Sequence, residues 1–122
     1  MGVNLEYIQF KSLLFDASNK ALNNYNVVVQ FYNINWNAWV TLTEILTVKE
    51  GKLFCKLELP DRISLSNQTI RIVRETLKAG SVPAFRVIKY TKEKNIPEII
   101  ATNYIVTIEA GNLTIDFGKM GC

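Results

Sequence analysis

Leu53-Phe54-Cys55-Lys56-Leu57-Glu58-Leu59 is the most regular apolar alternation in this chain of 122 residues. Every second side chain falls on the same face of a β-strand, so this period predicts a strand with one face buried. On that face the small side chain of Cys55 is expected to lie among leucines as a buried apolar group. The preceding Lys49-Glu50-Gly51-Lys52 predicts a tight hairpin turn, because its glycine can adopt a positive φ.

The same period of two extends along the chain on both sides of this strand. It predicts further strands, with turns about every ten residues, over 7–15, 27–32, 39–47, 67–76, 86–91, 99–109 and 112–117. No long helical pattern, repeat or linker interrupts them. Seven to eight short strands at this spacing predict an all-β fold, an antiparallel β-sandwich that residues 1–122 form as a single domain. A polar turn, Lys92-Glu93-Lys94-Asn95, is expected between two of the later strands.

The arginines of the second half give one candidate contact surface. If Ile70 and Ile72 point into the core from a strand, Arg71 points outward and Arg74 breaks the alternation, as at a bulge. Such a face could meet an acidic partner protein. The more ordinary interpretation is solvated arginines paired with Glu75. Residues 75–79, followed by a glycine, fit either one helical turn with a glycine cap or a strand that runs into a loop.

The composition argues against most catalytic chemistry. The chain has no histidine and only two cysteines, which removes the commonest general base and metal ligand, so neither an enzyme, a metal site nor a cofactor is expected. Asp116-Phe117-Gly118 matches the metal-binding triplet of protein kinases, but the other kinase motifs are missing, and the triplet is interpreted as the end of the last strand.

Charge and hydropathy exclude two further classes of partner. The net charge is only +3, and the basic residues are spread from Lys11 to Lys119, so nucleic acid is not an expected partner. No apolar run approaches the roughly 20 residues that a membrane helix needs, so no membrane insertion is expected. Residues 1–6 lack the pattern of a signal peptide, which predicts a cytoplasmic protein as written, or a component of an exported or virion assembly.

Four consecutive segments carry a family resemblance. Phe15–Leu22 is the end of a strand followed by a polar turn and a small residue before leucine, and Val27–Phe31 is a strand of valines. Thr47–Leu53 starts with the threonine that ends a strand and continues into a charged turn with a glycine. Cys55–Leu59 is a strand in which apolar and charged residues alternate. In this order they resemble the opening of a transthyretin-like, or carboxypeptidase-regulatory-like, domain. The resemblance covers about half of the chain. It implies a sandwich that packs beside other domains or assembles into larger bodies, an immunoglobulin-like sandwich being the alternative. The resemblance assigns no functional residue of that family to a position in this chain.

An asparagine-rich segment with aromatic residues gives a second candidate site. Tyr32, Asn35, Trp36 and Trp39 lie close together in the sequence. Aromatic rings beside amides can bind sugars, because rings stack on the apolar sugar face and amides bond its hydroxyls. The more ordinary interpretation is a corner between two strands with a tryptophan that caps the core.

The expected function follows from the compact fold and the missing catalytic groups. We expect a non-catalytic protein-protein interaction or structural subunit of a larger bacterial or viral assembly, of the kind found in secretion or injection apparatuses. Its expected partners are other protein subunits, including a second copy of itself. The alternative is a small-ligand or carbohydrate-binding module centred on Tyr32, Trp36 and Trp39.

Overall fold

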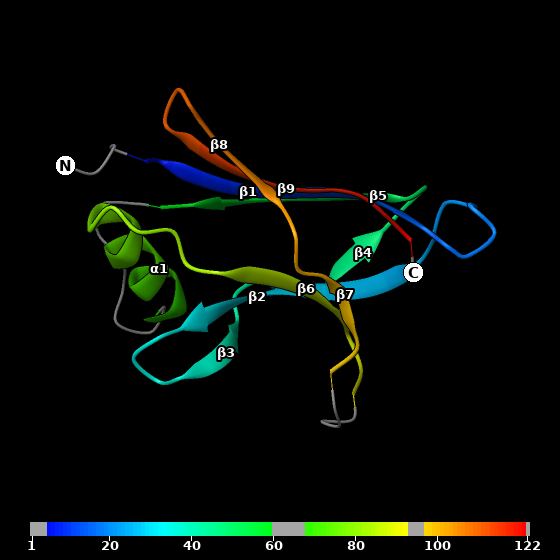
Figure 1. The fold of residues 1–122 in the computed structure, drawn as a ribbon, viewed down its shortest axis with the longest axis horizontal. Coiled ribbons are helices and arrows are strands. Elements are labelled where there is room, and N and C mark those ends of the chain that lie inside the picture. Colours follow the sequence, from blue (N-terminus) through cyan, green and yellow to red (C-terminus); the bar gives the residue numbers. More distant parts are fainter. Residues whose placement is uncertain (1–4, 60–67, 93–96, 122) are drawn as a thin grey trace.

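Two β-sheets stack face to face in the structure, a computed structural model that describes residues 5–59, 68–92 and 97–121 (Figure 1). The first sheet has four strands in the order β5 (Lys52–Glu58), β1 (Tyr7–Phe15), β9 (Asn112–Gly121) and β8 (Ile105–Glu109). The second has the order β3 (Ala38–Thr41), β2 (Tyr25–Asn33), β6 (Phe85–Lys89) and β7 (Ile99–Ala101), and β4 (Leu46–Val48) also pairs with β2. The predicted all-β sandwich is confirmed.

The core lies between the facing surfaces of the two sheets. The alternating apolar positions of β1, β9, β2 and β6 supply its fully buried side chains, among them Ile8, Phe10, Leu14, Leu113, Ile115, Val27, Val29, Phe31, Phe85 and Val87. Phe10 of the first sheet meets Phe85 of the second edge to face, with ring centroids 5.1 Å apart. Burial of a side chain of this size contributes about 1.5–3 kcal/mol, so these residues fix which face of each strand points inward.

A chain of aromatic rings continues from this contact to the edge of the core. Phe85 meets Tyr104 at 6.1 Å, and Tyr104 meets Phe117 of β9 at 5.5 Å. The Tyr104 hydroxyl accepts a hydrogen bond from the Phe85 backbone N–H at 3.3 Å and donates one to the Pro83 carbonyl at 3.4 Å. Tyr104 therefore links the two sheets, because its ring contacts one residue of each sheet and its hydroxyl bonds to the backbone at the start of β6.

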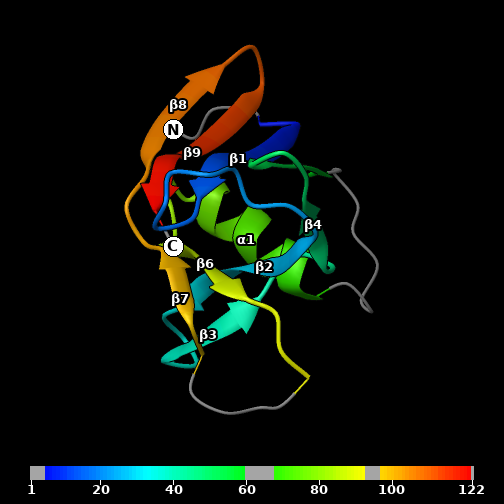
Figure 2. The same ribbon diagram turned by 90° about the vertical axis from the view of Figure 1, so that its right-hand side faces the viewer.

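Residues 68–78 form a helix, α1 (Gln68–Lys78), where the period of two predicted a strand. The buried positions Ile70, Val73 and Leu77 follow the helical spacing, and α1 lies between the two sheets at one end of the sandwich (Figures 1 and 2). Gly80, at φ 87°, ends the helix: its N–H donates to the Leu77 carbonyl, and the Ser81 N–H donates to that of Thr76. This Schellman motif matches the predicted glycine cap but closes a full helix rather than one turn.

The strand predicted over 99–109 is divided between the two sheets. β7 pairs with β6 in the second sheet and β8 pairs with β9 in the first, so the chain crosses from one sheet to the other around Tyr104. The tight turn at Glu50 and Gly51 is present, since both residues have positive φ as in a type I′ turn and Lys49 pairs with Lys52 across it. It does not join the strands of a hairpin, because β4 pairs with β2 in the second sheet and β5 pairs with β1 in the first. The turn predicted over 92–95 falls largely outside the described residues.

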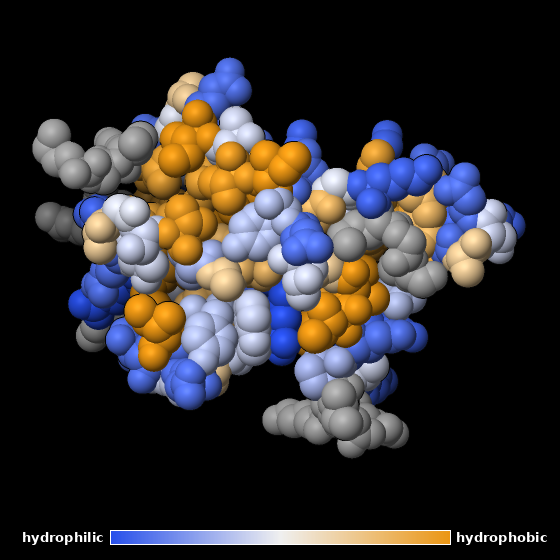
Figure 3. Space-filling model, viewed as in Figure 1, coloured by the Kyte–Doolittle hydropathy of each residue, from blue (hydrophilic) through white to orange (hydrophobic). Residues whose placement is uncertain are grey.

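The first sheet has one parallel pair of strands and one edge strand with exposed apolar side chains. β1 pairs with β9 in parallel, joining segments about a hundred positions apart in the sequence. β8 is an edge strand of this sheet, and all five of its residues are exposed, including Ile105, Val106 and Ile108. Figure 3 shows the resulting apolar surface over the β8–β9 hairpin. Strands of this kind leave backbone N–H and C=O groups without a sheet partner.

Candidate functional site

The predicted aromatic site is only partly assembled on the outer side of the second sheet. Tyr32 and Trp39 are opposite each other on β2 and β3 and pack edge to face at 5.3 Å. The Arg86 guanidinium lies over the Trp39 ring, 4.3 Å from its centroid, and its Nε donates to Gln30 Oε1 at 2.8 Å. A sugar stacking on that face of Trp39 would have to displace Arg86.

The two other predicted residues of this site lie in the turn between β2 and β3. The side chain of Trp36 is 57% exposed, and the backbone N–H of Asn35 donates to Asn33 Oδ1 at 3.0 Å. The Tyr32 hydroxyl is hydrogen-bonded to Asn37 instead. The sugar site therefore stays a prediction, and its rings do not form one continuous platform.

The predicted arginine surface belongs to a helix and not to a sheet. Arg71 and Arg74 both lie on α1, so the predicted bulge at Arg74 does not occur. Arg71 Nε lies 3.3 Å from Glu75 Oε1, one helical turn later, as the more ordinary interpretation expected. An exposed pair of this kind contributes little to stability, about 0.3–0.5 kcal/mol.

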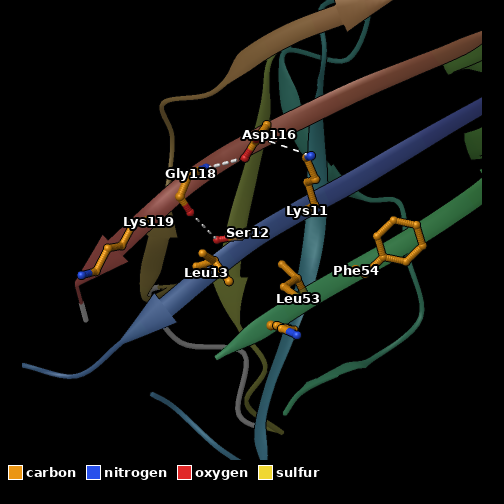
Figure 4. A pocket seen from close by; sticks show the side chains of 9 residues that line it. Lys11, Ser12, Leu13, Leu53, Phe54, Asp116, Gly118 and Lys119 are labelled. Atoms are coloured by element: carbon orange, nitrogen blue, oxygen red, sulfur yellow. Dashed lines mark hydrogen bonds and ion pairs between the residues drawn. The ribbon is translucent and has the colours of Figure 1, made fainter. Parts of the chain in front are cut away.

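A pocket that the sequence analysis missed lies on the outer side of the first sheet (Figure 4). Its cavity has a volume of about 410 Å³ and is lined by residues of three strands, β1, β5 and β9, namely Lys11, Ser12, Leu13, Lys52, Leu53, Phe54, Asp116, Gly118 and Lys119. Two of these are large apolar residues that stay exposed, Leu13 at 43% and Phe54 at 60%. Exposed apolar side chains that gather in a hollow are typical of binding sites.

The strand register arranges the pocket residues in two rows across the sheet. In the first row, Leu13 of β1 lies between Lys52 of β5 and Lys119 of β9. In the second row, Lys11 lies between Phe54 and Asp116. Neighbouring strands are about 4.8 Å apart and the rows are about 6.7 Å apart, which is two residues along a strand.

A bulge in β9 brings Lys119 into the first row. Between the pairs Lys11–Asp116 and Leu13–Lys119, β9 has one residue more than β1. Gly118 takes up this extra residue at φ 72°, a conformation that glycine adopts without steric cost. Its N–H donates to Asp116 Oδ1 at 2.8 Å, and its carbonyl accepts from Ser12 Oγ at 3.3 Å. Asp116-Phe117-Gly118 thus forms a bulge inside the strand and not its end.

The charges of the pocket are unequal. Three lysines face one carboxylate. Lys11 Nζ lies 3.8 Å from Asp116 Oδ2, and Lys119 Nζ lies over the Phe15 ring at 4.6 Å. Within the described part of the chain Lys52 has no ion pair. The pocket therefore combines apolar surface with an excess of positive charge from three lysines on outward strand positions. Only the register of β1 with β5 and β9 reveals that they share one hollow.

The described residues contain no group of three or more His, Cys, Asp or Glu side chains that could hold a metal ion. Cys55 is half-buried rather than buried, and burial, together with the nearby charge of Glu44, raises the pKa of its thiol. Among the described helices, none is long and apolar enough to cross a membrane.

The chain is a β-sandwich with a pocket on the outer face of one sheet, and comparison with solved structures finds proteins that are similar to it. Chlorocatechol 1,2-dioxygenase from Pseudomonas putida matches over 98% of this chain and 62% of its own, at 9% identity and a TM-score of 0.49. Catechol 1,2-dioxygenase from Acinetobacter sp. matches over 98% of this chain and 53% of its own, at 11% identity and a TM-score of 0.47. The pilus adhesin SpaC from Lactobacillus rhamnosus GG matches over 93% of this chain and 14% of its own, at 11% identity and a TM-score of 0.29.

The chain spans less than two thirds of the length of each of these proteins. At 9–13% identity the likeness concerns the fold alone and transfers no activity. The prediction of a non-catalytic interaction or structural subunit of a larger assembly was wrong by this comparison, because the solved structures found first are dioxygenases.

No family model matches the sequence. No curated protein matches it either. The resemblance to transthyretin-like domains therefore stays a prediction, and so do the expected protein partners, a second copy of the chain included.

Proposed function

We propose that this chain is a small-molecule-binding domain whose site is the pocket formed by β1, β5 and β9. The observation that carries the proposal is the hollow itself, with a volume of about 410 Å³ and two exposed apolar side chains within it. Binding pockets for small molecules typically have volumes of about 300–1,000 Å³ and combine apolar walls with a few polar groups.

The structure also explains why such a site would be rigid. β1 is a central strand of the first sheet, hydrogen-bonded on one side to β5 and on the other to β9. On its inner face Phe10 and Leu14 are fully buried, which fixes the backbone from which Lys11 and Leu13 project. A site on paired strands holds its side chains in place more accurately than a site on loops.

A fragment screen read by ¹H–¹⁵N correlation spectra tests this function. We expect ligands to shift the amide resonances of Leu13, Phe54 and Lys119 together, with little change on the second sheet. Phe54→Ala should abolish most of these shifts. Ile34→Ala is the matched control, because it removes an apolar side chain that is 78% exposed elsewhere. Shifts scattered over the surface, or an equal loss in both variants, would overturn the proposal.

A further inference from the structure

We infer that the ligand of this pocket is an amphipathic monoanion. It has one negatively charged group and an aromatic or alkyl body about 6.7 Å away, which is the distance of two residues along a strand. The inference rests on the proposed function and adds the chemical class of the ligand. It follows from the way the two rows of side chains differ in charge.

The first row can hold an anion. Leu13 is flanked on either side by a lysine, Lys52 and Lys119, each on a directly neighbouring strand. The two lysine backbones are therefore about 10 Å apart. Lys119 Nζ lies over the Phe15 ring in the structure, and its flexible four-carbon stem allows it to leave that ring, so that both ammonium groups reach a group placed above Leu13. In Figure 4 the side chain of Leu13 lies between those of Lys119 and Phe54. A carboxylate above Leu13 would meet two cations and no acidic side chain of its own row.

The second row does not compete for a second negative charge. Lys11 is already paired with Asp116, so the two charges largely cancel. The remaining member of this row is Phe54, whose ring is 60% exposed. It offers an apolar surface about 6.7 Å from the first row, the distance of two residues along a strand. A ligand that satisfies both rows carries its charge at one end and its apolar part at the other.

The length of the ligand follows from this spacing. In 3-phenylpropionate two methylene groups separate a carboxylate from a benzene ring, which is close to the spacing of the two rows. Its neutral counterpart, 3-phenylpropanamide, has the same shape without the charge. Inorganic phosphate has the charge without the apolar body. These three probes separate the two halves of the inference.

The experiment measures the dissociation constants of the three probes for the whole chain from amide shifts in ¹H–¹⁵N spectra at low salt. We expect 3-phenylpropionate to bind at least roughly fivefold more tightly than the amide or phosphate. Lys52→Gln and Lys119→Gln should each weaken its binding by roughly two- to fivefold, and Phe54→Ala by roughly five- to tenfold. Lys20→Gln is the matched control: it removes the same charge from an exposed turn and should leave the affinity unchanged.

The other possible results contradict either this inference alone or the proposed function as well. If the amide binds as tightly as the carboxylate, the anion is not recognised and the inference fails, while small-molecule binding stands. If phosphate alone binds as tightly, the apolar body is not recognised and the inference fails as well. If no probe and no fragment shifts the pocket resonances, the proposed function fails too. The comparison of probes needs only the unmodified chain, so it does not depend on whether a variant folds.

Discussion

The helix between the sheets offers the sharpest test of the fold, because its buried face rests on few residues. Val73 of α1 is fully buried. Val73→Ala removes two carbon atoms, worth about 0.8 kcal/mol each in transfer free energy, or about 1.6 kcal/mol. The cavity left behind adds to this loss, and the better helix propensity of alanine offsets about 0.5 kcal/mol. We therefore expect the free energy of unfolding to fall by about 2 kcal/mol.

Urea unfolding followed by circular dichroism measures this change. The midpoint should fall while the slope stays the same, since the amount of surface exposed on unfolding hardly changes. Arg71→Ala is the control on the same helix, because its side chain is exposed and forms an ion pair with Glu75. It should cost no more than about 0.5 kcal/mol. Equal and small losses in both variants would refute the packing of α1 into the core.

Three further changes test individual contacts. Gly118→Ala meets no neighbouring atom but places a side chain at φ 72°, so it should cost about 1 kcal/mol in urea unfolding; no loss would contradict the bulge. Tyr104→Phe leaves the N–H of Phe85 without this acceptor and should cost about 1–2 kcal/mol by the same measurement, whereas a neutral result would show that this hydrogen bond does not stabilise the fold. Hydrogen bonds from the backbone N–H groups of Lys20 and Ser18 lower the pKa of Asp16 below its ordinary value of 3.8. The stability that Asp16 contributes is therefore complete above pH 3.8 and is lost as the pH falls through its lower folded pKa. The stability difference from Asp16→Asn should shrink over that range, and a difference that is constant with pH would contradict the assignment.

Much of the fold could be predicted from local patterns. The alternation of Ile8, Phe10 and Leu14 indicates the buried face of β1, and Gly51 indicates the tight turn before β5, because both depend only on neighbouring residues. The strands that this turn joins lie in different sheets, which a local pattern does not specify. The helix could not be recognised in this way. Ile70 and Ile72 satisfy a period of two, and only the burial of Val73 and Leu77 shows that the period of the helix prevails. Here the packing at the end of the sandwich decides between two similar local patterns.

The candidate site was harder to predict than the fold. Tyr32 and Trp39 do meet, but Arg86, more than forty positions later in the sequence, occupies the ring face that a ligand would need. The pocket residues looked like ordinary outward positions of three separate strands. Their common hollow depends on the register of β1 with β5 and on a bulge in β9, and both are long-range pairings that a local pattern does not specify.

The parallel pairing of β1 with β9 has a consequence for how the protein folds. Gln9 and Thr114, which are hydrogen-bonded side by side, lie 105 positions apart. During synthesis the ribosome makes β1 about a hundred residues before β9, so one edge of β1 stays unpaired while the intervening chain is made. Closure of a loop of this length makes folding slow, and until then the exposed strand can pair with another nascent chain. Chaperones that shield hydrophobic strands would therefore matter most for this domain just before β9 emerges.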